Sequence, residues 1–351
     1  MTLAADRLVD WGTARAVGGQ VAARGVVLSP EDRATLPEHF EQVVPEAESI
    51  VGEFTGLEPG VYPSRPWVQT RADWLGANLR GFERVMEPFA HKLLDDRRDG
   101  ASGVIRRHVL GAQIGALLGY LGRRVLGQYD PFAPPDDDGL IYFVAPNIVG
   151  IERRFSFPQR DFRLWLAFHE TCHRLQFGGV PWLRGHLAGS VERYLTSVEL
   201  DPRWLLDRLE HALKEVRAGG LDHRDLGWFA LLMTEDQRDM VRRLQGLMSL
   251  LEGHATFVMN SVVRERVPMA DAFHQTLHER RTKRGMEKAF QKVIGFDVKV
   301  RQYDQGERFV SSVVAEVGMD RFNRIWESPA NLPTLGEIAR PERWVARVAA
   351  F

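Results

Sequence analysis

Apolar residues recur at helical spacing along most of this chain of 351 residues. Positions i, i+3, i+4 and i+7 are repeatedly apolar, which is the spacing of one face of an α-helix. The pattern predicts helices over residues 11–23, 38–54, 70–94, 102–126, 161–177, 182–187, 191–200, 203–216, 228–263, 271–290, 306–317 and 320–327, and a short helical pair over 334–351. Most of the chain is therefore expected to be helical.

One segment departs from the helical pattern. Residues 140–145 read Leu-Ile-Tyr-Phe-Val-Ala, a short apolar run rich in strand-forming residues, and Pro146-Asn147 ends it. We expect a strand here, one of few in the chain. The sequence thus predicts a mainly α fold with a small β-sheet element.

Three glycines, Gly111, Gly115 and Gly119, recur at spacing four inside the helix predicted over residues 102–126. Glycine costs a helix about 1 kcal/mol relative to alanine, so a row of glycines on one face needs a reason. Close approach of a neighbouring helix backbone is the preferred reason, and dimerisation is the alternative.

The chain shows no internal repeat and no low-complexity linker. We therefore predict a single domain over residues 1–351. Its core would lie at about residues 65–265, and a C-terminal helical part would follow at residues 266–351.

The composition is that of an ordinary globular protein, with 44% hydrophobic and 26% charged residues. The net charge of −1 gives no broad basic field, so we expect no nucleic-acid and no membrane partner. The first residues lack the pattern of a signal peptide, and no apolar run reaches about 18 residues. These features predict a cytoplasmic protein and leave its oligomeric state open.

The segment from His169 to His173 carries the strongest chemical signal, because it reads H-E-x-x-H inside the helix predicted over residues 161–177. Histidines at positions i and i+4 lie on the same helix face, so both imidazoles can bind one metal ion. Glu170, beside the first histidine, can act on a water at that metal. The spacing predicts a zinc-dependent hydrolase.

The surroundings of the motif strengthen this interpretation. Phe162, Leu166 and Gln176 lie within roughly 60° of His169 around the helix, so the histidines are expected on its buried side. Unpaired buried polar groups cost about 1–3 kcal/mol each, and a metal would remove that cost. The alternative is a pair of core histidines bonded to backbone carbonyls. Cys172, the single cysteine, is expected to be a small buried filler.

A catalytic zinc usually takes three protein ligands and leaves one position for water, so a third ligand is needed. Residues 244–263 carry the best candidates. Glu252 and His254 flank the apolar stripe of that helix on nearly opposite sides, so they are not expected to bind one ion together. Glu252 is preferred over His254, and its alternative role is an ion pair with Arg174 or Arg193.

Further motifs extend the match beyond H-E-x-x-H. They are, in chain order, Arg65-Pro-Trp67 with Asn78, Gly111-Ala-Gln-Ile-Gly115, Val125-Leu-Gly-Gln-Tyr-Asp130, Val144-Ala-Pro-Asn147, Trp165-Leu-Ala-Phe-His-Glu-Thr-Cys-His173, Gln176-Phe177, Val180-Pro-Trp-Leu183 and Leu251-Glu-Gly-His-Ala255. Through them the chain resembles a family of zincin-like actinobacterial metalloproteins known as coenzyme F-420 biosynthesis-associated proteins and zinc metallopeptidases. The resemblance implies a mainly α zincin-like domain with a small β-sheet beside the motif helix. It also implies Zn²⁺ held by His169, His173 and Glu252, with Glu170 as the catalytic residue.

The implied chemistry is hydrolysis. Zinc would lower the pKa of its water from about 15.7 toward about 7, and Glu170 would pass the proton to a leaving amine. In zincin-like hydrolases an edge strand near the motif helix usually holds an extended substrate by main-chain bonds. The strand expected over residues 140–145 is the candidate edge, and a plain core strand is the alternative.

We therefore predict a zinc hydrolase, resembling a metallopeptidase, that acts on a peptide or small amide substrate. Two alternatives stay open. One is a non-catalytic zinc protein whose site is closed by a fourth protein ligand, and the other is a small-molecule amide hydrolase associated with deazaflavin coenzyme biosynthesis.

Overall fold

The structure is a computed structural model that describes residues 8–23, 25–86, 101–133, 139–197, 233–263, 266–282 and 301–349. The chain forms two compact units. Unit 1 comprises residues 1–53 and 57–179, and unit 2 comprises residues 54–56 and 180–351. The expectation of one domain over residues 1–351 stays a prediction.

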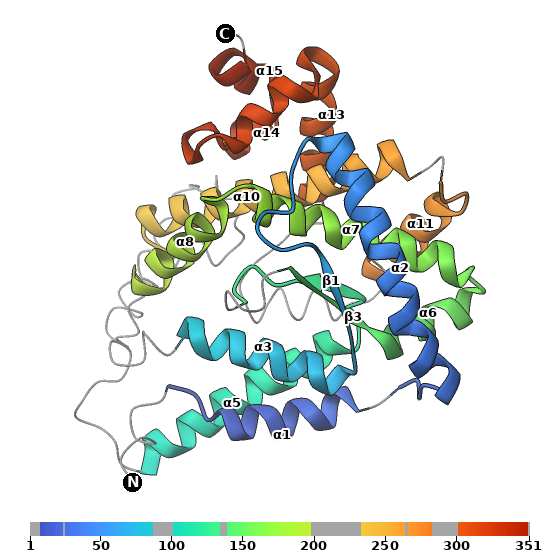
Figure 1. The fold of residues 1–351 in the computed structure, drawn as a ribbon. Helices are drawn as coiled ribbons and strands as arrows, with labels where there is room; N and C mark the ends of the chain where they lie inside the picture. The colour runs from blue at the N-terminus through green and yellow to red at the C-terminus, as the bar shows by residue number, and fades with distance from the viewer. Residues whose placement is uncertain are drawn as a thin grey trace. The chain divides into compact units, whose positions relative to one another are not determined.

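Unit 1 consists of helices around one small sheet (Figure 1). Its described helices are α1 (Trp11–Ala22), α2 (Pro30–Thr55, which ends in unit 2), α3 (Arg71–Met86), α5 (Ala101–Gly122), α6 (Ala145–Phe155) and α7 (Gln159–Gly179). Its described strands are β1 (Arg65–Gln69), β2 (Gly127–Tyr129) and β3 (Leu140–Val144). These elements confirm the predicted mainly α fold with a small sheet, and the motif helix is α7.

Strand β3 lies in the middle of the sheet, whose order is β1-β3-β2. It pairs in parallel with β1 and antiparallel with β2. The prediction that residues 140–145 form an edge for substrate is therefore wrong, because both edges of β3 are already paired. Its continuous apolar sequence fits a strand that is covered on both faces.

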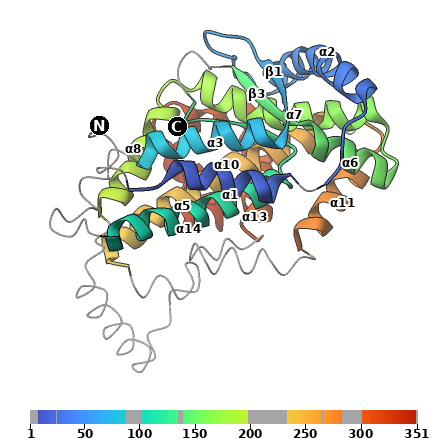
Figure 2. The same ribbon diagram turned by 90° about the horizontal axis from the view of Figure 1, so that it is seen from below.

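Helices cover both faces of the sheet, with α3 on one face and α2 and α7 on the other (Figures 1 and 2). On the first face, the Gln128 side chain of β2 bonds to Trp74 of α3. On the second, Phe40 of α2 stacks on Phe143 of β3 with ring centroids 3.8 Å apart. The short strand β2 is thus held between α3 and α7.

The three glycines of α5 face α1, which confirms the preferred explanation for their spacing. A Cβ atom added to any of them would meet a backbone oxygen at Asp10, Ala14 or Gly18. Only hydrogen side chains let the two backbones come this close. The glycine row is therefore a packing device within one chain.

Unit 2 is helical throughout its described part. Its α-helices are α8 (Leu183–Ser197), α10 (Glu235–Val262), α11 (Ala270–Thr282), α13 (Arg301–Phe322), α14 (Leu335–Ile338) and α15 (Pro341–Trp344), and its short 3-10 and π segments are η4 (Asn323–Trp326), η5 (Pro329–Asn331) and η6 (Val345–Ala349). Helices α10 and α13 cross closely where Gly253 and Gly306 meet, since a Cβ on either would touch the other helix backbone.

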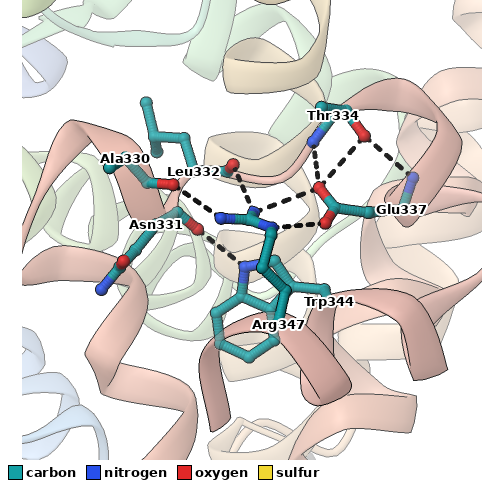
Figure 3. Close-up of polar contacts among 7 residues, drawn as sticks. All are labelled: Ala330, Asn331, Leu332, Thr334, Glu337, Trp344 and Arg347. Atoms are coloured by element: carbon teal, nitrogen blue, oxygen red, sulfur yellow. Dashed lines mark hydrogen bonds and ion pairs between the residues drawn. The ribbon is translucent and has the colours of Figure 1, made fainter.

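The last helices of unit 2 are fixed by a polar cluster (Figure 3). Arg347 Nε donates to Glu337 Oε1 at 2.6 Å, and Glu337 also accepts from the backbone N–H of Thr334 at 2.9 Å. Burial raises the pKa of Glu337, but the bonds from Arg347 and Thr334 outweigh burial and hold it below its ordinary value. Trp344 Nε1 donates to the Asn331 carbonyl at 2.7 Å, which places its buried ring in the core of unit 2.

Several predicted element boundaries differ from the structure. The two helices predicted over residues 182–187 and 191–200 are one helix, α8, which begins at Leu183 and ends at Ser197. Helix α6 differs from the sequence prediction, because Pro146 does not end the chain's regular structure but occupies the first turn of this helix. The helix predicted over residues 203–216 lies outside the described residues. Among the described helices, none combines the length and the apolar character required to cross a membrane.

Candidate metal centre

Helix α7 carries the H-E-x-x-H motif and is buried on most of its surface. Even two of its arginines, Arg163 and Arg174, are fully buried. A helix surrounded in this way lies inside the protein and does not face solvent along one side. His169 and His173 are half-buried, so they lie where this otherwise buried helix is open. This differs from the amphipathic pattern that we expected, and it gives the histidine pair access to solvent.

The two histidines lie next to each other, as the i, i+4 spacing predicts. Their ring centroids are 4.9 Å apart and the ring planes are perpendicular. His173 Nδ1 lies 3.0 Å from Oε1 of the buried Gln176. In the tautomer with the proton on Nδ1, that nitrogen donates to the amide oxygen and Nε2 carries the lone pair that a metal needs. An outer partner of this kind is typical of histidines that bind metals, so the donor set fits a zinc ion.

Glu170 lies beside the histidines and is 6% exposed. Its Oε2 accepts a hydrogen bond from the backbone N–H of Tyr129 in β2 at 3.1 Å. Gly127, two residues earlier in β2, lies against the carboxylate, since a Cβ there would be 2.6 Å from Glu170 Cγ. Neither contact could be predicted from the sequence. Tyr129 is 41 residues from Glu170 along the chain, and the backbone N–H that it donates does not depend on its residue type.

Strand β2 packs on the same face of α7 from which Glu170 projects. The Tyr129 ring stacks on Phe177 with centroids 5.8 Å apart. The Arg174 guanidinium lies 5.9 Å from the centre of the same ring. Glu170, Arg174 and Phe177 are spaced i, i+4 and i+7, so they share one face of the helix. Helix α7 therefore presents two neighbouring faces, one with the histidines and one that receives β2.

A buried ion pair fixes α7 against α6. Arg163 donates from Nε to Glu152 Oε1 at 2.8 Å and from Nη2 to Glu152 Oε2 at 3.0 Å, and His39 contacts the same guanidinium. Two parallel hydrogen bonds fix the orientation of the guanidinium relative to the carboxylate. Rotation of either helix would separate the pair and leave an unpaired charge buried, which is costly. The pair thus helps to set the direction in which the histidines point.

The proposed third ligands both lie on α10 in unit 2. Glu252 is half-buried. His254 is 0% exposed, and its ring stacks parallel to Phe322 at 5.7 Å and meets Trp326 edge-on at 5.4 Å. His254 thus belongs to the aromatic core of unit 2. The assignment of Glu252 as a ligand, with His254 as the alternative, stays a prediction.

The arginines considered as ion-pair partners of Glu252 have hydrogen bonds of their own. Arg174 Nη2 donates to the Tyr62 carbonyl at 2.5 Å, and Arg193 Nη2 donates to Ser190 Oγ at 3.1 Å. The ion pair of Glu252 with either arginine stays a prediction.

Cys172 is fully buried, as expected for a small filling residue. Burial, and to a lesser degree the charge of Glu170, raises the pKa of its thiol. A raised pKa keeps the sulfur protonated, and a protonated thiol is a poor nucleophile and a poor metal ligand.

Comparison with known proteins agrees with this geometry. Residues 9–345 match the zincin-like metallopeptidase family. A crystal structure from Chloroflexus aurantiacus, of a protein described as a candidate hydrolase with a novel fold, is similar over 97% of this chain and 98% of its own. The two proteins share 31% identity, and their structures superpose with a TM-score of 0.73. No protein of curated function is detectably similar to this chain.

Proposed function

Because the chain belongs to the zincin-like metallopeptidase family, we propose that it is a zinc-dependent hydrolase that cleaves peptide or other amide bonds. In this proposal His169, His173 and Glu252 are the zinc ligands, and Glu170 is the general base. The observation that carries it is the adjacent, half-buried pair of imidazoles on α7 with a buried carboxylate beside them. The similarity to a candidate hydrolase supports the same class of reaction.

The chemistry divides between the metal and the protein. Zinc, when bound, would act as a Lewis acid that polarises the scissile carbonyl and makes water a better nucleophile. Glu170 takes a proton from the attacking water on a carboxylate oxygen and delivers it to the leaving amine. The Gln176 amide oxygen, 3.0 Å from His173 Nδ1, supports the tautomer whose Nε2 can bind the metal.

Glu252 is proposed as the third ligand for two reasons. A half-buried carboxylate beside the apolar stripe of α10 is an oxygen donor of the kind that completes a site of two histidines and one carboxylate. The ring of His254, in contrast, already packs between aromatic side chains in the core of unit 2.

A hydrolysis assay tests the proposed reaction. Zinc-loaded wild-type protein is incubated with a peptide library and a set of small N-acyl amides, beside zinc-loaded Glu170→Gln. We expect cleavage by the wild type and a loss of about 10²- to 10⁴-fold in Glu170→Gln, because the amide cannot accept the proton. The zinc content of the two proteins should be equal.

The outcome also separates the alternatives. Cleavage confined to small amides would favour the small-molecule hydrolase associated with deazaflavin coenzyme biosynthesis. Zinc bound at full occupancy, with no cleavage that depends on Glu170, would contradict the proposal and favour a non-catalytic zinc protein.

A further inference from the structure

The edge of strand β2 that does not pair with β3 faces Glu170. The backbone N–H of Val144 donates to the Leu126 carbonyl at 2.8 Å, which makes these two residues a hydrogen-bonded pair of the antiparallel ladder. Hydrogen-bonded and non-bonded pairs alternate along such a ladder, so Tyr129 opposite Ile141 is a non-bonded pair. The N–H of Tyr129 therefore points away from β3, and there it meets Glu170 Oε2 at 3.1 Å.

Gly127 shapes the space that the carboxylate occupies. Successive side chains of a strand point to opposite faces, so position 127 faces the same way as Tyr129, toward α7. A Cβ on Gly127 would lie 2.6 Å from Glu170 Cγ and 2.7 Å from Oε1. Carbon and oxygen atoms do not approach this closely without displacement, so even alanine would move the Glu170 side chain.

Gln128 fixes β2 from the opposite face. Its Oε1 accepts from Trp74 Nε1 at 2.6 Å, and its Nε2 donates to Asn78 Oδ1 at 3.1 Å. Both partners belong to α3. A strand of three residues has little pairing of its own, so these bonds and the stacking of Tyr129 on Phe177 determine where its edge lies.

We propose that β2 is the positioning element of the general base: the N–H of Tyr129 holds the Glu170 carboxylate in a space that only glycine at position 127 leaves open. This inference rests on the proposed role of Glu170 and adds to it. Tyr129 and Gly127 act through Glu170 and are positioning residues. Preorganisation of this kind matters because a misplacement of about 1 Å can cost 10²-fold in rate.

A double-mutant cycle tests the contact without any assay of activity. Urea denaturation is measured for the wild type, Gly127→Ala, Glu170→Ala and the double variant. We expect Gly127→Ala to lower the midpoint in the wild type, and most of that shift to disappear when Glu170 is alanine, because the truncated side chain leaves room for the new methyl group.

Gly19 on α1 supplies the matched control. A Cβ there meets nothing within 4 Å, so Gly19→Ala should shift the midpoint equally with and without the Glu170 side chain. An equal shift from Gly127→Ala in both backgrounds would overturn the proposal.

Hydrogen exchange of the Tyr129 amide provides a second test that leaves Gly127 intact. Glu170→Gln retains an acceptor oxygen of the same shape, whereas Glu170→Ala removes it. We expect the Tyr129 amide to stay protected in Glu170→Gln and to exchange faster in Glu170→Ala. Equal protection in the two variants would contradict the hydrogen bond as the positioning contact.

Kinetics then connect the contact to catalysis. In zinc-loaded Gly127→Ala we expect kcat to fall by about 10- to 100-fold, with KM within about twofold and with unchanged zinc content. If the double-mutant cycle shows that Gly127 and Glu170 are coupled, and Gly127→Ala nevertheless leaves kcat unchanged, the positioning role is overturned. Absence of Glu170-dependent cleavage in the wild type would instead refute the proposed function and leave the contact established.

Discussion

At the scale of single residues, the contact between His173 and Gln176 is the one that most directly prepares a proposed metal ligand. An amide oxygen at this position favours the tautomer protonated on Nδ1, whose Nε2 can bind a metal. Gln176 is fully buried on α7, three residues after His173. Removal of the acceptor oxygen should therefore weaken zinc binding without opening the fold.

The variant Gln176→Met tests this expectation, because methionine has nearly the same shape and no amide. We expect zinc affinity, measured by competition with a chelator, to fall by about 10- to 100-fold. Gln176→Glu keeps an acceptor oxygen and serves as the control, which should bind zinc at least as well as the wild type. Equal affinities in the methionine and glutamate variants would show that the bond does not support the site.

The spacing of residues along the chain allowed the histidine pair to be predicted, but not the contacts that position Glu170. His169 and His173 were recognised because the i, i+4 spacing determines which side chains share a helix face. Gly127 and Tyr129 were missed, although both lie in a motif noted for family resemblance. Tyr129 contributes a backbone N–H, which every residue except proline has, and Gly127 contributes the absence of a side chain.

At the scale of elements, the interface between α1 and α5 shows how Gly111, Gly115 and Gly119 allow two helices to pack closely. Gly115 on α5 lies against the backbone of Ala14, with no space for a methyl group. We expect Gly115→Ala to lower the free energy of unfolding by about 1–3 kcal/mol, because the backbones must separate.

Gly19→Ala on α1 is the matched control for this prediction. It changes glycine to alanine inside a helix with nothing near the added methyl, so it should raise stability by up to about 1 kcal/mol. Both variants are compared with the wild type by urea denaturation. A higher free energy of unfolding for Gly115→Ala than for the wild type would show that the interface between α1 and α5 is not tightly packed.

The elements themselves were predicted to different degrees. Long helices such as α5 and α7 were found because apolar periodicity persists over many turns. The strand β3 was found from its composition, but its place in the middle of the sheet depends on β1 and β2. Strand β2 has three residues, too few for any periodic signal, and its position is set by Trp74 and Asn78 on α3. Short elements fixed by distant partners cannot be predicted from local pattern.

At the scale of the whole molecule, the match to the zincin-like metallopeptidase family extends over residues 9–345, so it covers both compact units. The central proposal concerns the intact chain: we propose that it binds one zinc ion through His169, His173 and Glu252.

Zinc content by mass spectrometry tests this claim most directly. The full chain is purified without chelator as wild type, Glu252→Gln and His254→Phe, the last chosen to preserve the aromatic packing around position 254. We predict about one zinc per chain in the wild type and in His254→Phe, and loss of zinc in Glu252→Gln. A wild type that contains no zinc and takes none up on addition, or a Glu252→Gln variant that keeps it, would contradict the account.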